Sequence, residues 1–409
     1  MSHRRKLIFR IITLLLIAAI LPWNAQQVHG QSGIEVSDAR VTVKFGSTIE
    51  FAAKIQAPIP IQQASILFRG VNEEVTRVES VQVAPDGSVS FIYDASLNVF
   101  PPFSLIVFWF QATLEDGNTY TSESITFPYN DNRFPWREMS RANITVHWYA
   151  GDEAFGASAL DAAGAGMLVL NDFLPLTLTE SINIYIYSNT TDLQNTLLLG
   201  GEEWVGGHTS PELGVVLVAV APGQSQSTEL AAKIPHELTH VMLYRSLGRS
   251  YASQPIWLIE GTATMMENPP NPEYQRALEV ASQNNALLSF ADLCESFPAD
   301  AGNAYLAYAQ SQSFVTYIRE TYGTNGLSRL TKAYSEGFSC ELGATNALGT
   351  PLSTLEARWR ESVLGQNLGM VAARNLSPFI LLMLLVLVVP IWGAIDLIHQ
   401  RRKRAAQSK

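Results

Sequence analysis

Residues 34–130 are divided into short runs of β-branched and aromatic residues by turn signals. Val89–Tyr93 and Ser104–Phe110 are two such runs, and Pro85-Asp86-Gly87 and Asp116-Gly117-Asn118 are two of the turns. Apolar runs of this length, bounded by Gly, Pro, Asn and Asp, predict strands joined by tight turns. Further strands are expected at Val41–Val43, Ile49–Ala52, Ser65–Phe68 and Thr119–Phe127.

The spacing of these strands indicates a fold class for the segment. About seven strands in about 95 residues are typical of an immunoglobulin-like or fibronectin-like β-sandwich. No cysteine lies in the segment, so the inter-sheet disulfide of antibody domains is absent. We therefore expect a β-sandwich domain at 34–130, followed by a linker at 129–136, and the sequence does not identify the partner of this domain.

The pattern changes beyond the linker, where strands and helices alternate. Ile144–Tyr149 and Ile182–Tyr187 alternate as strands do, and the Ala-rich stretch Ala154–Leu170 between them is typical of a helix. Gly214–Val220 is a further expected strand, and a helix is predicted at Thr228–Leu247. After this helix the pattern stays helical to about residue 363. A mixed lobe followed by a helical lobe predicts an α+β domain at 140–366.

Both ends of the chain are apolar. Basic residues 4–6 precede the run Ile11–Leu21, which is short for a bilayer span, so residues 1–30 are predicted to be a secretory signal peptide. Pro378–Ile395 carries no charge, and four basic residues follow at 401–404. This length and this flank predict a transmembrane helix at 378–398 with a cytoplasmic tail at 399–409, the alternative being a buried core helix.

This topology predicts a single-pass protein of the cell membrane with residues 31–376 outside the cell, whether or not the first segment is cleaved. The net charge of the chain is −10, and residues 1–30 and 377–409 each carry a net charge of +4. The segment between them therefore has a net charge of −18. Nucleic acid is excluded as a partner, because neutralising phosphates requires clustered cations.

The chain has only two cysteines, Cys294 and Cys340, and both lie in the outward segment. Outside the cell they can form a disulfide, and two separate buried thiols are the alternative. A structural zinc site of four thiolates is excluded, because it needs twice as many cysteines.

Residues 236–240 read His-Glu-Leu-Thr-His within the predicted helix. Histidines four residues apart lie on one helix face, about 6 Å apart along the axis, so both imidazoles can reach one metal ion. Glu237 projects beside them toward a water molecule. A catalytic zinc needs a third protein ligand and one open position, and Glu260 on the next predicted helix is the candidate ligand.

The helix that carries Glu260 has its own boundary signals. Ser253 is expected to cap it, Pro255 to lie in its first turn, and Asn268-Pro269-Pro270 to end it. Gly261 is expected to let this helix approach the histidine helix closely.

Pro-His-Glu-Leu-Thr-His at 235–240, followed by Trp-Leu-Ile-Glu-Gly at 257–261, resembles the gluzincin metallopeptidases of the thermolysin-like clan, and most of all their peptidase-MA-like bacterial families. The resemblance covers about residues 140–365 and neither the β domain nor the terminal helix. It implies a zincin-like catalytic domain that hydrolyses a peptide or protein substrate. One zinc ion per chain would be held by His236, His240 and Glu260, with Glu237 as general base.

The same resemblance implies two further features. An oxyanion donor comes from the helical lobe, and Tyr308 is the first candidate and Tyr305 the second, with ordinary packing as the alternative for both. An extended substrate pairs with an edge strand before the metal-binding helix, and Gly214–Val220 fits that place.

The sequence departs from the family pattern at two positions. Pro235 removes a helix hydrogen bond directly before the first histidine, so a kink or a restart of the helix is expected. Thr264 stands where thermolysin-like proteins carry a supporting Asp, which leaves the support of His236 unassigned. Two other histidines are interpreted without catalytic roles. His208 is expected to be a surface loop residue, with a place near the cleft as the alternative, and His147 is expected to be structural.

Two main functions are consistent with these features, besides a zinc hydrolase that acts on a non-peptide bond. The first is a membrane-anchored extracellular zinc metallopeptidase. The alternative is a surface binding or adhesion protein with a non-catalytic zinc domain, which the complete set of ligands and base disfavours.

Overall fold

The computed structural model describes residues 34–97, 100–173, 179–197, 207–366 and 368–407. The chain divides into two compact units, one ending at Arg133 and the other beginning at Phe134. The predicted signal peptide at 1–30 lies outside the described residues.

The first unit is rich in β-sheet, as predicted. One sheet has the order β1-β2-β5 and consists of strands β1 (Glu35–Lys44), β2 (Thr48–Gln56) and β5 (Ser88–Asp94). A second sheet has the order β4-β3-β6-β7, with β8 also paired to β6, and consists of β3 (Ile61–Gly70), β4 (Arg77–Val81), β6 (Leu105–Leu114), β7 (Thr119–Thr121) and β8 (Ile125–Pro128).

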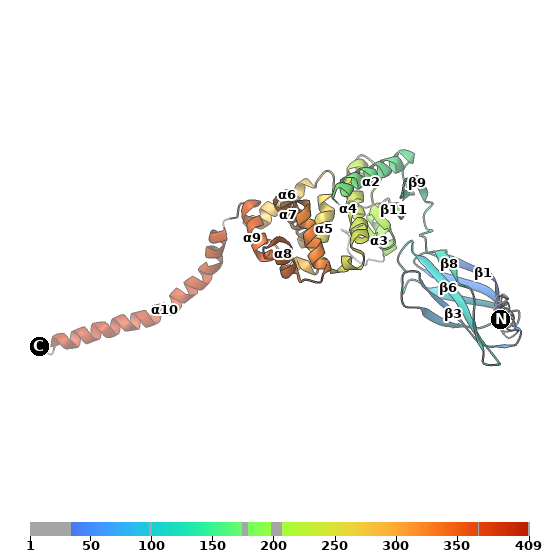
Figure 1. Ribbon diagram of the computed structural model, residues 1–409. Helices are drawn as coiled ribbons and strands as arrows, with labels where there is room; N and C mark the ends of the chain where they lie inside the picture. The colour runs from blue at the N-terminus through green and yellow to red at the C-terminus, as the bar shows by residue number, and fades with distance from the viewer. Residues whose placement is uncertain (1–33, 98–99, 174–178, 198–206, 367, 408–409) are drawn as a thin grey trace, which may run out of the picture. The chain divides into compact units, whose positions relative to one another are not determined.

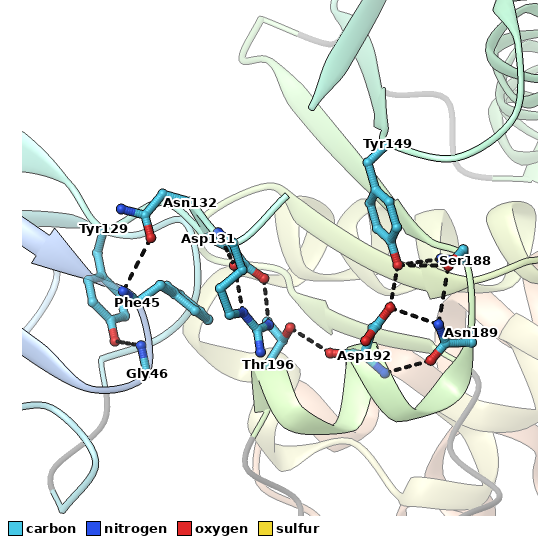
Figure 2. Close-up of polar contacts among 11 residues, drawn as sticks. Phe45, Gly46, Tyr129, Asp131, Asn132, Tyr149, Ser188, Asn189, Asp192 and Thr196 are labelled. Carbon is cyan, nitrogen blue, oxygen red and sulfur yellow. Dashed lines mark hydrogen bonds and ion pairs between the residues drawn. The ribbon is translucent and has the colours of Figure 1, made fainter. Parts of the chain in front are cut away.

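Aromatic rings join the two sheets of this unit. Phe51 of β2 contacts Phe68 of β3 and Phe108 of β6, with ring centroids 5.2 Å and 5.1 Å apart, and all three side chains are buried. At the end of the unit the hydroxyl of Tyr129 accepts a hydrogen bond from the Gly46 amide at 3.0 Å (Figure 2). The β-rich architecture is confirmed, whereas the immunoglobulin-like topology stays a prediction.

The second unit begins with a five-stranded sheet in the order β12-β13-β11-β10-β9. Its strands are β9 (Arg137–Arg141), β10 (Ile144–Trp148), β11 (Ile182–Tyr187), β12 (Gly207–Ser210) and β13 (Val215–Ala219), and its helices are α2 (Glu153–Phe173), α3 (Thr190–Leu197) and α4 (Gln226–Leu247). Strands β10, β11 and β13 are parallel, and the two outer strands are antiparallel to their neighbours.

Apolar side chains of α2 and α4 cover one face of this sheet. Ile184 and Val216 from the strands pack with Leu160 of α2 and Leu238 of α4 in one buried cluster. Beyond the strand ends, the Tyr149 hydroxyl donates to Asp192 at 2.7 Å and accepts from the Ser188 amide at 2.9 Å, which ties β10 to the start of α3 (Figure 2).

The rest of this unit is helical, as the pattern predicted. It contains η1 (Gly248–Ser253), α5 (Ile256–Met265), α6 (Pro272–Gln283), η2 (Asp292–Cys294), α7 (Ala301–Ser335), α8 (Cys340–Leu348) and α9 (Leu352–Ser362) (Figure 1). Trp257, Phe290, Phe314 and Trp359 form its aromatic core. The expected disulfide is confirmed, because Cys294 and Cys340 are bonded across Cα atoms 6.3 Å apart.

The last helix, α10 (Leu368–Gln407), contains an apolar stretch from Leu376 to His399 with a mean hydropathy of 2.6 and no buried share. Such a stretch is consistent with a membrane anchor. Helix α2 also meets the length and hydropathy criteria, but 39% of its apolar stretch is buried, as in a core helix of a folded domain.

Candidate metal centre

Three side chains that the sequence assigned to a metal meet at the junction of α4 and α5. The Nε2 atoms of His236 and His240 lie 3.6 Å and 3.7 Å from Oε2 of Glu260. One ligand atom from each of the three side chains lies within 4.8 Å of the other two. The i, i+4 spacing on α4 explains why the two imidazoles share a face, and α5 brings the carboxylate opposite them.

The turn between the two helices is held by polar contacts that differ from those expected. The Gln254 side-chain amide donates to the Ser250 and Thr331 carbonyls, both at 3.2 Å. The prediction that Ser253 caps α5 is wrong, because its hydroxyl donates to the Ser250 carbonyl and the cap position belongs to Pro255.

Gly261 and Pro235 also behave differently from the sequence expectation. A Cβ on Gly261 would lie 2.4 Å from the Ser311 carbonyl oxygen, so this glycine allows the close approach of α7 to α5 rather than that of α4. Helix α4 runs through Pro235 as one element, so the restart expected there does not occur.

The outer nitrogen of each imidazole has its own partner. Nδ1 of His236 lies 3.0 Å from Oε1 of Glu267, and Nδ1 of His240 lies 3.0 Å from the hydroxyl of Tyr251. When each Nδ1–H donates to its partner, each Nε2 keeps a lone pair facing Glu260. These contacts are compatible with the tautomer that a metal ligand requires.

Sequence reasoning missed both partners. The sequence left the support of His236 unassigned, and the buried hydroxyl of Thr264 makes no hydrogen bond with any described residue. Glu267 follows Glu260 by seven residues, but α5 ends at Met265, so helix periodicity gives no signal for this residue. Tyr251 lies in the short helix η1, where periodicity gives no such signal.

Negative charge is concentrated around the two imidazoles. Burial lowers the pKa of His236, but hydrogen bonds with Glu260 and Glu267 outweigh it and raise the pKa to about 10. Burial alone would raise the pKa of Glu260, and the charges of His240 and His236 lower it below its usual value. The site therefore favours a cation, and two imidazole nitrogens with one carboxylate oxygen match the donor set of zinc.

Glu237 lies beside this centre, and residues of strand β12 contact its carboxylate. Its side chain is 8% exposed, and the Thr209 hydroxyl donates to its Oε2 at 2.6 Å. A Cβ on Gly207 would lie 2.2 Å from its Oε1, so the carboxylate occupies the space that this glycine leaves free.

The substrate-pairing strand expected at Gly214–Val220 is wrongly placed. Strand β13 pairs with β11 on one side and with β12 on the other, so β12 is the edge of the sheet within the part of the chain that the structure describes. Its four residues, Gly-His-Thr-Ser, lack the alternation by which strands are recognised in a sequence. His208 is exposed on this strand and is not a loop residue.

A cleft of about 630 Å³ borders the centre. Its lining includes His236 and Glu237 of the centre and Gly207 of β12. Across the cleft, three tyrosines contribute to the lining, and these are Tyr274, Tyr305 and Tyr308. The cleft therefore places β12, the ligand residues and the tyrosines around one space.

The two tyrosines named from the sequence lie in different surroundings. The Tyr308 ring centroid lies 6.2 Å from that of His236 and 5.0 Å from that of Phe297. Burial, followed by the charges of Glu260 and Glu237, raises the pKa of Tyr308, so its hydroxyl stays protonated. Tyr305 instead packs on Tyr274 with ring centroids 5.0 Å apart and is partly exposed.

His147 lies apart from the centre, on β10. Its Nε2 is 3.1 Å from Oδ1 of Asn183, and its ring stacks on Tyr185 at 4.3 Å between centroids. These contacts agree with a structural role.

Solved structures are similar to small parts of this chain. Wild-type OgpA from Akkermansia muciniphila is 16% identical over 25% of this chain and 28% of that chain, with a TM-score of 0.21. The Br derivative of BhCBM56 is 11% identical over 22% of this chain and 88% of that chain, with a TM-score of 0.18. Likenesses of this size support no inference about function.

Comparison with curated proteins gave no match. The model of a protein family, in contrast, matches residues 162–365, the segment that contains α4, α5 and the three clustered side chains, and its description is the Peptidase MA superfamily. This match confirms the resemblance that the motifs indicated. Residues 162–365 therefore match the Peptidase MA superfamily, which supports a zincin-like metallopeptidase family for this segment.

Proposed function

We propose that this protein is a zinc metallopeptidase, anchored in the cell membrane by α10, that hydrolyses peptide bonds outside the cell. The convergence of His236, His240 and Glu260 within 4.8 Å carries the proposal. These three side chains would hold the zinc ion, one per chain. When bound, the ion would supply the Lewis acidity that makes water a nucleophile and a carbonyl an electrophile at neutral pH.

The residues around this centre supply the proton transfers and the positioning. Glu237 accepts a proton from water and passes it to the leaving amine as general base and acid. The Thr209 hydroxyl holds the Glu237 carboxylate at one orientation. Tyr308 remains protonated at neutral pH and would donate a hydrogen bond to the oxyanion.

An extended peptide is the substrate that the cleft fits best. Strand β12 has a free edge among the described strands and lines the cleft through Gly207, beside Glu237. A peptide that pairs with this edge through its main chain would bring its carbonyl groups toward the centre. Tyr274 and Tyr305 offer apolar surface to its side chains.

The location of the enzyme rests on its ends and its cysteines. A signal peptide predicted at 1–30, an anchor predicted at 378–398 and a basic tail at 399–409 support a location of both units outside the cell. The Cys294–Cys340 disulfide is typical of an oxidising compartment. The β-rich unit at 34–130 would be an immunoglobulin-like or fibronectin-like module with a binding partner of its own.

The proposal is tested with the full chain in detergent, comparing the native protein with Glu237→Gln. Zinc is measured by elemental analysis and turnover with a peptide library. Glu279→Gln, at an exposed position of α6, is the matched control. We expect about one zinc per chain in all three proteins and hydrolysis only in the native protein and the control. Equal hydrolysis by Glu237→Gln would overturn the peptidase assignment and leave the binding or adhesion protein as the remaining function.

A further inference from the structure

Pro235 interrupts the hydrogen bonds of α4 one residue before the first histidine. Proline has no amide hydrogen, so the carbonyl of Ala231, four residues earlier, has no helical partner at this position. The structure gives this carbonyl another partner. The backbone amide of Asn268 donates to it at 3.2 Å, although Asn268 lies beyond the end of α5.

The residue before Asn268 is Glu267, whose carboxylate lies 3.0 Å from Nδ1 of His236. Two adjacent residues therefore contact α4. Asn268 does so through its main-chain amide and Glu267 through its side chain. The Glu267 amide also donates to the Thr264 carbonyl at 3.2 Å, which keeps this residue in register with the last turn of α5.

We propose that Pro235 is a positioning residue for the zinc centre, because its missing amide leaves the Ala231 carbonyl free to dock Asn268 and so fixes Glu267 against His236. This inference rests on the proposed zinc site. It explains why a residue unfavourable inside a helix stands beside a ligand. The supporting carboxylate is held by main-chain geometry rather than by its own rotamer alone.

Packing around Pro235 permits a clean substitution. A Cβ on Gly166 of α2 would lie 2.9 Å from Cβ and Cγ of Pro235, so the ring fills space against that glycine. Alanine keeps the Cβ and restores the amide. In Pro235→Ala the new amide competes with Asn268 for the Ala231 carbonyl, and helix propensity at position 235 rises.

The test measures zinc affinity by chelator competition in the full chain. Loss of a group that supports a metal ligand typically costs about 10- to 100-fold in metal affinity, and we expect this range for Pro235→Ala and for Glu267→Gln. The double variant should lose no more than Glu267→Gln alone, because both changes remove the same support. Asn268→Ala is the matched control, since it keeps the main-chain donor and should bind zinc as the native protein does.

Two readouts separate this role from a general loss of structure. The thermal midpoint of Pro235→Ala should be unchanged or higher, while hydrogen exchange at the Asn268 amide becomes faster in the metal-free protein. Native zinc affinity in Pro235→Ala, or unchanged exchange at Asn268, overturns the proposal. If the native chain binds no zinc, the proposed function fails, and the exchange measurement alone then decides whether Pro235 docks Asn268.

Discussion

Gly207→Ala tests whether strand β12 controls the position of the Glu237 carboxylate. The added Cβ would lie 2.2 Å from Oε1 and 2.8 Å from Cδ of Glu237. A carbon and an oxygen normally stay about 3.3 Å apart or more, so the carboxylate must move by roughly 1 Å. The displaced group is the end of a flexible side chain, and Gly207 has a backbone conformation open to any residue.

The expected result is a loss of turnover without a loss of structure. A misplacement of about 1 Å in a catalytic site can reduce the rate about 100-fold, equivalent to ~2.7 kcal/mol of activation free energy. Zinc content and the thermal midpoint should stay native, because the three ligand residues are untouched. The assay is kcat on a peptide substrate, with zinc measured in the same preparation.

Gly164→Ala in α2 is the matched control for this variant. Its nearest neighbour would be Nη1 of Arg141 at 3.8 Å, an ordinary contact distance. It should retain native kcat. The reasoning about β12 fails if Gly207→Ala turns over substrate at the native rate, or if it loses zinc together with activity.

Two further predictions concern Tyr308 and the disulfide. Tyr308→Phe should reduce kcat by about 100-fold with zinc retained, because it removes an oxyanion donor. The kcat of Tyr305→Phe should stay near the native value. Equal kcat values in the two variants would exclude the role of Tyr308. The double variant Cys294→Ala, Cys340→Ala opens a loop with a sequence separation of 46. On the chain-entropy estimate it should lower the free energy of unfolding by about 4 kcal/mol, measured by denaturant unfolding. An unchanged unfolding midpoint would refute this prediction.

The parts of the centre that depend on helix periodicity could be predicted from the sequence. The expected helix at Thr228–Leu247 is α4, Gln226–Leu247, and its i, i+4 histidines face the carboxylate of the next helix. A helix places side chains by a fixed rotation per residue, so spacing alone determined which groups share a face. That these groups bind zinc stays a prediction.

The parts that depend on tertiary contacts could not be predicted in this way. Strand β12 exists because it pairs with β13, and its Gly-His-Thr-Ser sequence carries no signal of its own. Gly261 was assigned to the contact with α4, although α7 is the helix that passes over it. Glu267 and Tyr251 reach the histidines from a helix end and a short turn, where no period links them to their partners.

The central claim is that His236, His240 and Glu260 hold one zinc ion. Its most direct test is elemental analysis of the purified full chain beside His240→Ala and Glu260→Gln, after dialysis against a weak chelator. The account predicts about one zinc per native chain and a large loss in both variants, with folding retained as judged by circular dichroism. Zinc absent from the native protein, or retained at full stoichiometry in both variants, would contradict it.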